Sequence, residues 1–116
     1  MKLSYKVWIE HHGKVFGDGP HELLRQVDKT KSLHQAANQM GMAYSKAWHL
    51  IRMLEQRLGF PLLERKVGGS SGGGSWITPK AKELMNLYGR FRKEVEEAME
   101  KIYQRHFGSM AKKAPK

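Results

Sequence analysis

The chain opens with alternating apolar and polar residues. Apolar side chains occupy every second position: Leu3, Tyr5, Val7 and Ile9. A period of two is expected of a strand with one buried face. Residues 11–14 are predicted to form a turn, and residues 15–16 a short second strand that pairs with the first. We therefore expect a small N-terminal β-hairpin that lies against the helices.

Two segments with helical spacing follow. Residues 17–20 read as a loop, and Pro20 suits the first position of a helix that runs to about Lys29. Ser32, followed three residues later by Gln35, matches a capping box, in which the hydroxyl and the glutamine each satisfy a free backbone amide. The pattern predicts a second helix from there to near Gly41.

A third helix is predicted over residues 44–58. Apolar residues recur there at steps of four, three and four: Ala47, Ile51, Leu54 and Leu58. That stripe predicts a buried face. Ala36 and Ala37 are small enough for the second and third helices to cross closely, and Gly41 permits a tight turn. The two helices therefore predict a helix-turn-helix.

A second hairpin is predicted directly after the third helix. Residues 59–61, Gly-Phe-Pro, end that helix, and residues 62–67 and 75–77 read as two short strands. Between them lies the glycine-rich segment 68–74. A hairpin in this place is typical of the wing of a winged helix-turn-helix.

The last helix carries a heptad pattern. Thr78 suits an N-cap and Pro79 a first helical residue, and apolar residues then follow at heptad spacing: Leu84, Tyr88, Phe91, Val95, Ala98 and Ile102. From residue 79 to about 104 the helix would span roughly 39 Å, too long to be buried on so small a body. We expect this stripe to form a homodimer interface; the alternative is an intramolecular core, with Tyr88 and Phe91 packed on the hairpin.

These elements predict a mainly α fold with small β-hairpins, a winged helix-turn-helix with a long C-terminal dimerisation helix. A chain of 116 residues suits one such domain. We divide it into a DNA-binding domain at 1–78, the dimerisation helix at 79–107, and a tail at 108–116. The tail has no periodic apolar positions and is expected to be a disordered basic segment.

The charge of the chain indicates an anionic partner. It has 21 Lys and Arg against 11 Asp and Glu, a net charge of +10. The surplus lies at the two ends, because residues 83–100 hold 3 basic and 5 acidic side chains while residues 101–116 hold 5 and 0. An excess of this size favours nucleic acid as partner, although solubility alone is another explanation.

Several kinds of chemistry are disfavoured. The chain has no cysteine, which excludes disulfides, thiolate metal sites and cysteine nucleophiles and points to a reducing cytoplasm. No run of about 18 apolar residues occurs, so we expect no membrane partner. The six histidines contain no H-x-x-x-H pair and the glycine-rich segment has no P-loop order. We expect neither an enzyme nor a metal or other cofactor.

The candidate DNA-binding residues lie mainly on the third helix. Opposite its apolar stripe are Ser45, Lys46 and His49, which suit base edges near the helix start. Arg52 and Gln56 lie further along and suit the phosphate backbone.

Further candidates flank that helix. The wing adds Arg65, Lys66, Ser70 and Ser71, and Ser32 and His34 lie where a helix start favours a phosphate oxygen. Ser32 is equally explained as a cap, and the glycine-rich segment as a plain hairpin loop.

The sequence resembles two families of regulators over about residues 20–105. Residues 43–48, Ala-Tyr-Ser-Lys-Ala-Trp, and the segment 68–74 before Ile77 and Thr78 resemble the winged helix-turn-helix of ModE-type, molybdate-responsive regulators. Residues 54–65 and the pair Thr78-Pro79 resemble LysR-type regulators, although Ala81 stands where that family commonly has glycine.

The resemblance implies a transcription regulator in which residues from Tyr44 to His49 enter the major groove and the long helix pairs two subunits. It does not imply molybdate sensing, because no part of this sequence corresponds to the oxyanion-binding or effector domains of those families. No small-molecule effector is evident.

We therefore expect a sequence-specific regulator that binds double-stranded DNA as a homodimer. Two rivals remain open. One is a sequence-indifferent, chromatin-like DNA-binding protein, and the other is an interaction protein that uses the long helix to join another regulator.

Overall fold

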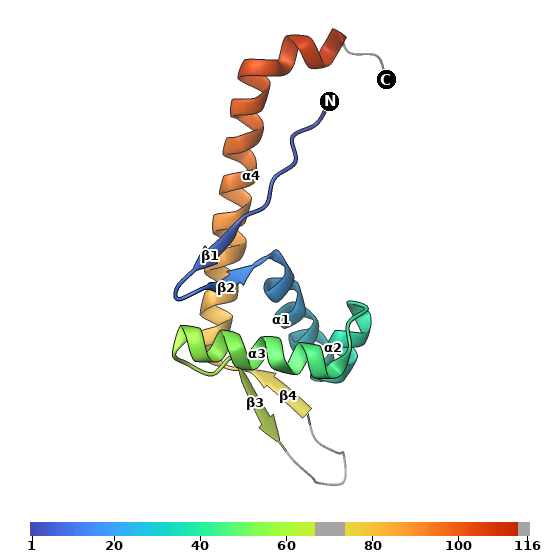
Figure 1. Ribbon diagram of the computed structural model, residues 1–116, viewed down its shortest axis with the longest axis vertical. Coiled ribbons are helices and arrows are strands. Elements are labelled where there is room, and N and C mark those ends of the chain that lie inside the picture. The colour runs from blue at the N-terminus through green and yellow to red at the C-terminus, as the bar shows by residue number, and fades with distance from the viewer. Residues whose placement is uncertain (67–73, 114–116) are drawn as a thin grey trace.

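A computed structural model describes residues 1–66 and 74–113 of the chain, with side chains as far as residue 110. A small body of helices and hairpins lies at one end of a long helix (Figure 1). The elements in order are β1 (Trp8–Glu10), β2 (Lys14–Gly17), α1 (Asp18–Thr30), α2 (Leu33–Gln39), α3 (Tyr44–Leu58), β3 (Leu63–Lys66), β4 (Gly74–Ile77) and α4 (Pro79–Lys113). The predicted fold class, mainly α with small hairpins, is confirmed.

The N-terminal hairpin is shorter than its sequence pattern suggests. Strands β1 and β2 pair antiparallel, with Trp8 opposite Gly17 and Ile9 opposite Phe16. Before β1, Leu3, Tyr5 and Val7 are half-buried while their polar neighbours are exposed. This segment runs beside α4 and not in a sheet (Figure 1). The alternation of apolar and polar residues at positions 3–7 therefore reflects packing of the apolar side chains against α4.

Helix α1 begins two residues before its predicted start. It runs from Asp18 to Thr30, so Pro20 is its third residue and the expected loop at residues 17–20 lies mostly inside the first turn. A proline is tolerated there because the first amides of a helix have no intrahelical acceptor.

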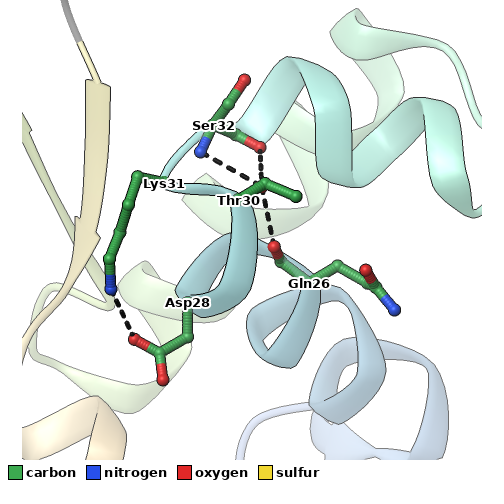
Figure 2. Close-up of polar contacts among 5 residues, drawn as sticks. All are labelled: Gln26, Asp28, Thr30, Lys31 and Ser32. Atoms are coloured by element: carbon green, nitrogen blue, oxygen red, sulfur yellow. Dashed lines mark hydrogen bonds and ion pairs between the residues drawn. The ribbon is translucent and has the colours of Figure 1, made fainter.

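The turn between α1 and α2 is held by short polar contacts (Figure 2). The Ser32 side chain accepts a hydrogen bond from the amide of Gln35 at 3.0 Å, which confirms the predicted N-cap. The other half of the capping box differs, because the Ser32 amide donates to the Thr30 hydroxyl at 3.2 Å instead of to Gln35. Lys31, with φ 57°, pairs with Asp28 at 3.1 Å across the turn.

The core lies where α1, α2 and α3 meet, and β2 and α4 cover it. Each of these elements contributes fully buried side chains: Phe16, Leu23, Leu24, Val27, Ala36, Ala37, Ala47, Leu54 and Tyr88. Leu62, from the loop before β3, completes the set. Ala36 and Ala37 are buried in this core, as expected from the need for small residues where α2 packs against α3. The rings of Phe16 and Tyr88 meet edge to face, with centroids 5.2 Å apart, and fasten the start of α4 to the N-terminal hairpin.

Helix α4 is longer than predicted. It continues to Lys113, so residues 108–113, expected in a disordered tail, are helical. The residues at positions 110–113 are methionine, alanine and lysine, which are good helix formers. Residues 114–116 lie outside the described part of the chain.

Candidate nucleic-acid interface

Helix α3 presents a free polar face. Its bounds, Tyr44–Leu58, match the prediction, and Ala47, Ile51 and Leu54 are buried as expected. On the opposite side every candidate residue is exposed: Ser45, Lys46, His49, Arg52 and Gln56. Within the described parts of the two hairpins and of α4, nothing covers these side chains, so they are open to a macromolecule that lies along α3.

The starts of α2 and α3 come together beside this face. The rings of His34 and Tyr44 lie 5.4 Å apart; His34 is exposed and Tyr44 is 39% exposed. Ser32 is half-buried and its hydroxyl caps α2. The cap is therefore its structural role, whereas His34 and Tyr44 extend the polar face toward α2.

The second hairpin forms where the sequence predicted a wing. Strands β3 and β4 pair antiparallel, with Arg65 opposite Ser75 and Lys66 opposite Gly74. Arg65 and Lys66 are both exposed, and the Lys66 ammonium lies 5.0 Å from the ring centroid of Trp76. The other two wing candidates, Ser70 and Ser71, lie outside the described residues.

Helix α3 is tied to the wing by a carboxylate that the sequence analysis did not single out. Oε2 of Glu55 accepts hydrogen bonds from the amides of Leu62 at 2.7 Å and Leu63 at 3.3 Å. These amides begin the hairpin, so Glu55 aligns β3 with the end of α3. The sequence signal is weak, since a single glutamate on a helix is usually solvated.

The wing is also fastened to the helix-turn-helix and to α4. The amide of Ser75 donates to the carbonyl of Lys31 at 3.0 Å. A Cβ atom at the preceding residue, Gly74, would lie 2.9 Å from the Trp76 ring and 3.1 Å from that carbonyl, so a larger residue there would force these groups to shift. Thr78 accepts from the amide of Ala81 and donates to the carbonyl of Pro61 at 2.8 Å, which confirms it as the cap of α4.

Two arginines of this surface share one aromatic ring. The guanidinium carbons of Arg52, on α3, and Arg65, on β3, lie 4.6 and 4.7 Å from the ring centroid of Trp48. Trp48 was noted only as part of a family-like segment. The one local signal for the contact is the i,i+4 spacing of Trp48 and Arg52, because the approach of Arg65 depends on the tertiary fold.

The predicted dimer stripe on α4 needs one correction. Tyr88 is only 2% exposed; its ring packs on Phe16 and its hydroxyl donates to Asp18 Oδ1 at 2.6 Å. Tyr88 therefore belongs to the core of the chain, as the alternative of an intramolecular core expected for this residue. Leu84 is half-buried against the same core.

The remaining stripe residues are accessible. Phe91 and Ile102 are 42% and 47% exposed, Val95 is half-buried and Ala98 is exposed. Leu87, which the heptad pattern omitted, is 52% exposed and lies one turn before Phe91. An apolar strip of Leu87, Phe91, Val95, Ala98 and Ile102 thus follows α4 away from the body.

The described residues show two further features that limit the kinds of site. Within 1–66 and 74–113, no three histidine, aspartate or glutamate side chains gather closely enough to hold a metal ion. None of the helices in the described part of the chain is both long and apolar enough to span a membrane.

The arrangement of α2, α3 and the β3–β4 hairpin defines a winged helix-turn-helix protein. The chain belongs to the lysR family of bacterial regulatory helix-turn-helix proteins, whose model matches residues 21–79.

Relatives and solved structures agree with this class. The chain is 34% identical over 76 residues to the transcriptional regulator ModE of Haemophilus influenzae, covering 66% of this chain and 30% of that protein. It is 36% identical over 89 residues to ModE of Yersinia pestis, covering 76% and 34%. The chain thus spans about a third of the length of these relatives.

Among solved structures, the BenM DBD in its complex with benA site 1 DNA matches with a TM-score of 0.58 at 21% identity, covering 78% of this chain and 96% of that one. At this identity the match shows the fold.

Proposed function

We propose that this protein is a sequence-specific transcription regulator that binds double-stranded DNA and catalyses no reaction. The observation that carries the proposal is the exposed polar face of α3 beside a basic wing. The family, the names of the ModE relatives and the DNA complex of the BenM DBD support it.

The residues divide by the part of DNA that they suit. Ser45, Lys46 and His49 lie in the first turns of α3 and are assigned to base edges in the major groove. Backbone phosphates are assigned to the residues around them: Tyr44, Arg52, Gln56, His34, Arg65 and Lys66, with Ser70 and Ser71 beyond the described residues. Ser32 is assigned to the same region through its place at the start of α2.

We further propose that α4 pairs two subunits. The strip from Leu87 to Ile102 exposes large apolar side chains in a row along α4, and a contiguous apolar patch of this kind is typical of a protein–protein interface. A two-fold pairing of α4 would place two copies of α3 on half-sites about 34–36 Å apart or a multiple of that spacing. The operator would then be roughly palindromic.

The first prediction tests the division between base and backbone contacts. After selection of bound duplexes from a random pool, Lys46→Ala and His49→Ala should change the preferred sequence and cost about 1–3 kcal/mol on the original site. Lys66→Ala should weaken binding to all duplexes alike and make the salt dependence shallower. Fluorescence anisotropy over a series of salt concentrations measures both effects.

A matched control is Lys93→Ala, which removes an exposed cation from α4 instead of the α3 face. Unchanged binding in all three test variants would remove this surface from the proposal. Equal affinity for selected and random duplexes would favour the sequence-indifferent rival. A monomer without DNA affinity would favour an interaction protein.

A further inference from the structure

The wing and α3 meet at one indole ring. Trp48 is half-buried and packs against the hydrophobic core, so its position is set by the body of the domain. Arg52 approaches it from one turn further along α3, and Arg65 approaches it from β3. A helix and the strand that follows it therefore place two guanidinium groups on a single aromatic side chain.

Both guanidinium groups keep their hydrogen-bond donors available. Among the described residues neither Arg52 nor Arg65 makes a hydrogen bond or an ion pair, and both side chains are exposed. Glu55 lines a small hollow together with Trp48 and the two arginines, but its Oε2 atom already accepts hydrogen bonds from the amides of Leu62 and Leu63.

Stacking on an aromatic ring suits an arginine that must bind phosphate. The ring stacks against the plane of the guanidinium group and leaves its N–H groups free. These groups donate within that plane, where their geometry matches two phosphate oxygens. The ring also restricts the conformations of the arginine side chain before DNA binds. Ordering such a side chain at an interface costs about twofold to tenfold in affinity, and a preformed arrangement avoids most of that loss.

We propose that Trp48 is a positioning residue that holds Arg52 and Arg65 as one preformed phosphate-binding pair on the DNA backbone. The pair joins the recognition helix to the wing, so both elements engage the same stretch of phosphodiester backbone. This inference rests on the proposed function, because it names how that DNA-binding surface is organised.

Double-mutant cycles test the role of the ring. We expect Trp48→Leu to weaken duplex binding by about twofold to tenfold per arginine released and to make the salt dependence shallower. Arg52→Gln and Arg65→Gln should each weaken binding clearly in the natural background and much less in the Trp48→Leu background. Trp48→Phe, which retains a ring, should restore most of the affinity and of the salt slope.

Two controls separate positioning from loss of stability. Leu50→Ala removes a half-buried side chain from the same helix, where it faces the hollow beside the N-terminal hairpin; it should lower the melting temperature without changing the salt slope. Arg65→Lys keeps the charge but loses the planar group, and it should bind less tightly than the natural protein.

The outcomes distinguish the two proposals. If the natural protein binds duplex and the arginine and tryptophan effects are simply additive, Trp48 positions nothing and only this inference is overturned. If Trp48→Phe behaves as Trp48→Leu, the aromatic face is not what matters and the inference is again overturned. If the natural protein binds no duplex, the proposed function fails and the inference fails with it.

Discussion

At the scale of single residues, one polar cluster decides how α4 sits on the body. Asp18, at the start of α1, accepts from the Tyr88 hydroxyl at 2.6 Å and from Arg92 Nε at 3.1 Å. Arg92 also donates to the Tyr5 hydroxyl at 3.2 Å, which joins the N-terminal segment to the same cluster and raises the pKa of Arg92. Burial, and then the Asp18 carboxylate, raise the pKa of Tyr88 to about 12.

The raised pKa of Tyr88 makes the stability of the fold depend on alkaline pH. In the unfolded chain the phenol ionises with its ordinary pKa of 10.0, whereas in the folded chain its pKa is about 12. Its stabilising contribution is therefore complete below pH 10.0 and is lost as the pH rises toward about 12. We expect urea denaturation to show a fall in the free energy of unfolding across this range.

The variant Tyr88→Phe should lack the decrease in the free energy of unfolding that ionisation of Tyr88 causes at alkaline pH. At neutral pH its free energy of unfolding should be about 1 kcal/mol lower, because one hydrogen bond is lost. Tyr44→Phe, at an exposed tyrosine without this cluster, is the control and should behave as the natural protein. Identical alkaline profiles for the natural protein and Tyr88→Phe would contradict this account.

At the scale of elements, the wing is a fixed part of the helix-turn-helix. Glu55 ties its first strand to α3, and the Ser75 amide ties its second strand to the turn after α1. Trp48 adds a contact between α3 and β3 through Arg65. The relative orientation of α3 and the wing is therefore set by contacts within the chain itself.

Glu55→Gln tests this link. A neutral amide oxygen accepts more weakly than a carboxylate, so we expect the free energy of unfolding to fall by about 1–2 kcal/mol. Glu64→Gln, at an exposed glutamate of β3, is matched in chemistry and should change it little. Chemical denaturation of the two variants gives the comparison; equal effects would mean that the Glu55 contacts contribute no stability.

At the scale of the whole molecule, the elements separate two surfaces. The body and α4 together extend over 62 × 30 × 20 Å, and α4 alone, with 35 residues, spans about 52 Å. The wing and α3 lie at one end, and the free part of α4 projects from the other (Figure 1). In the proposed function, one end contacts DNA and the other pairs with a second copy of the chain.

Phe91→Asp tests the proposed pairing. An unpaired carboxylate in an apolar interface is costly, so we expect the dimer dissociation constant to rise by about tenfold or more and DNA affinity to fall with it. Asn86→Asp adds the same carboxylate at an exposed polar position of α4 and should leave the dimer intact. Sedimentation equilibrium measures both; an unaltered dimer with Phe91→Asp would contradict the assignment of this strip.

The amino-acid sequence by itself determined the features that depend on near neighbours in the chain. The period of Ala47, Ile51 and Leu54 set the buried face of α3, and side-chain oxygens set the caps at Ser32 and Thr78, because helical periodicity and capping involve residues three or four apart. The separation of a polar α3 face from a buried one followed from the same periodicity.

Only the tertiary structure decided which surfaces each element covers. Tyr88 and Leu87 are adjacent and both suit an apolar stripe, yet Phe16 and Asp18 bury the first and leave the second exposed. Arg65 reaches Trp48 only because the wing folds back on α3, and Tyr5 reaches Arg92 only because the two ends of the chain pack together. Such contacts depend on how α4 and the wing dock on the body, which no local pattern of residues specifies.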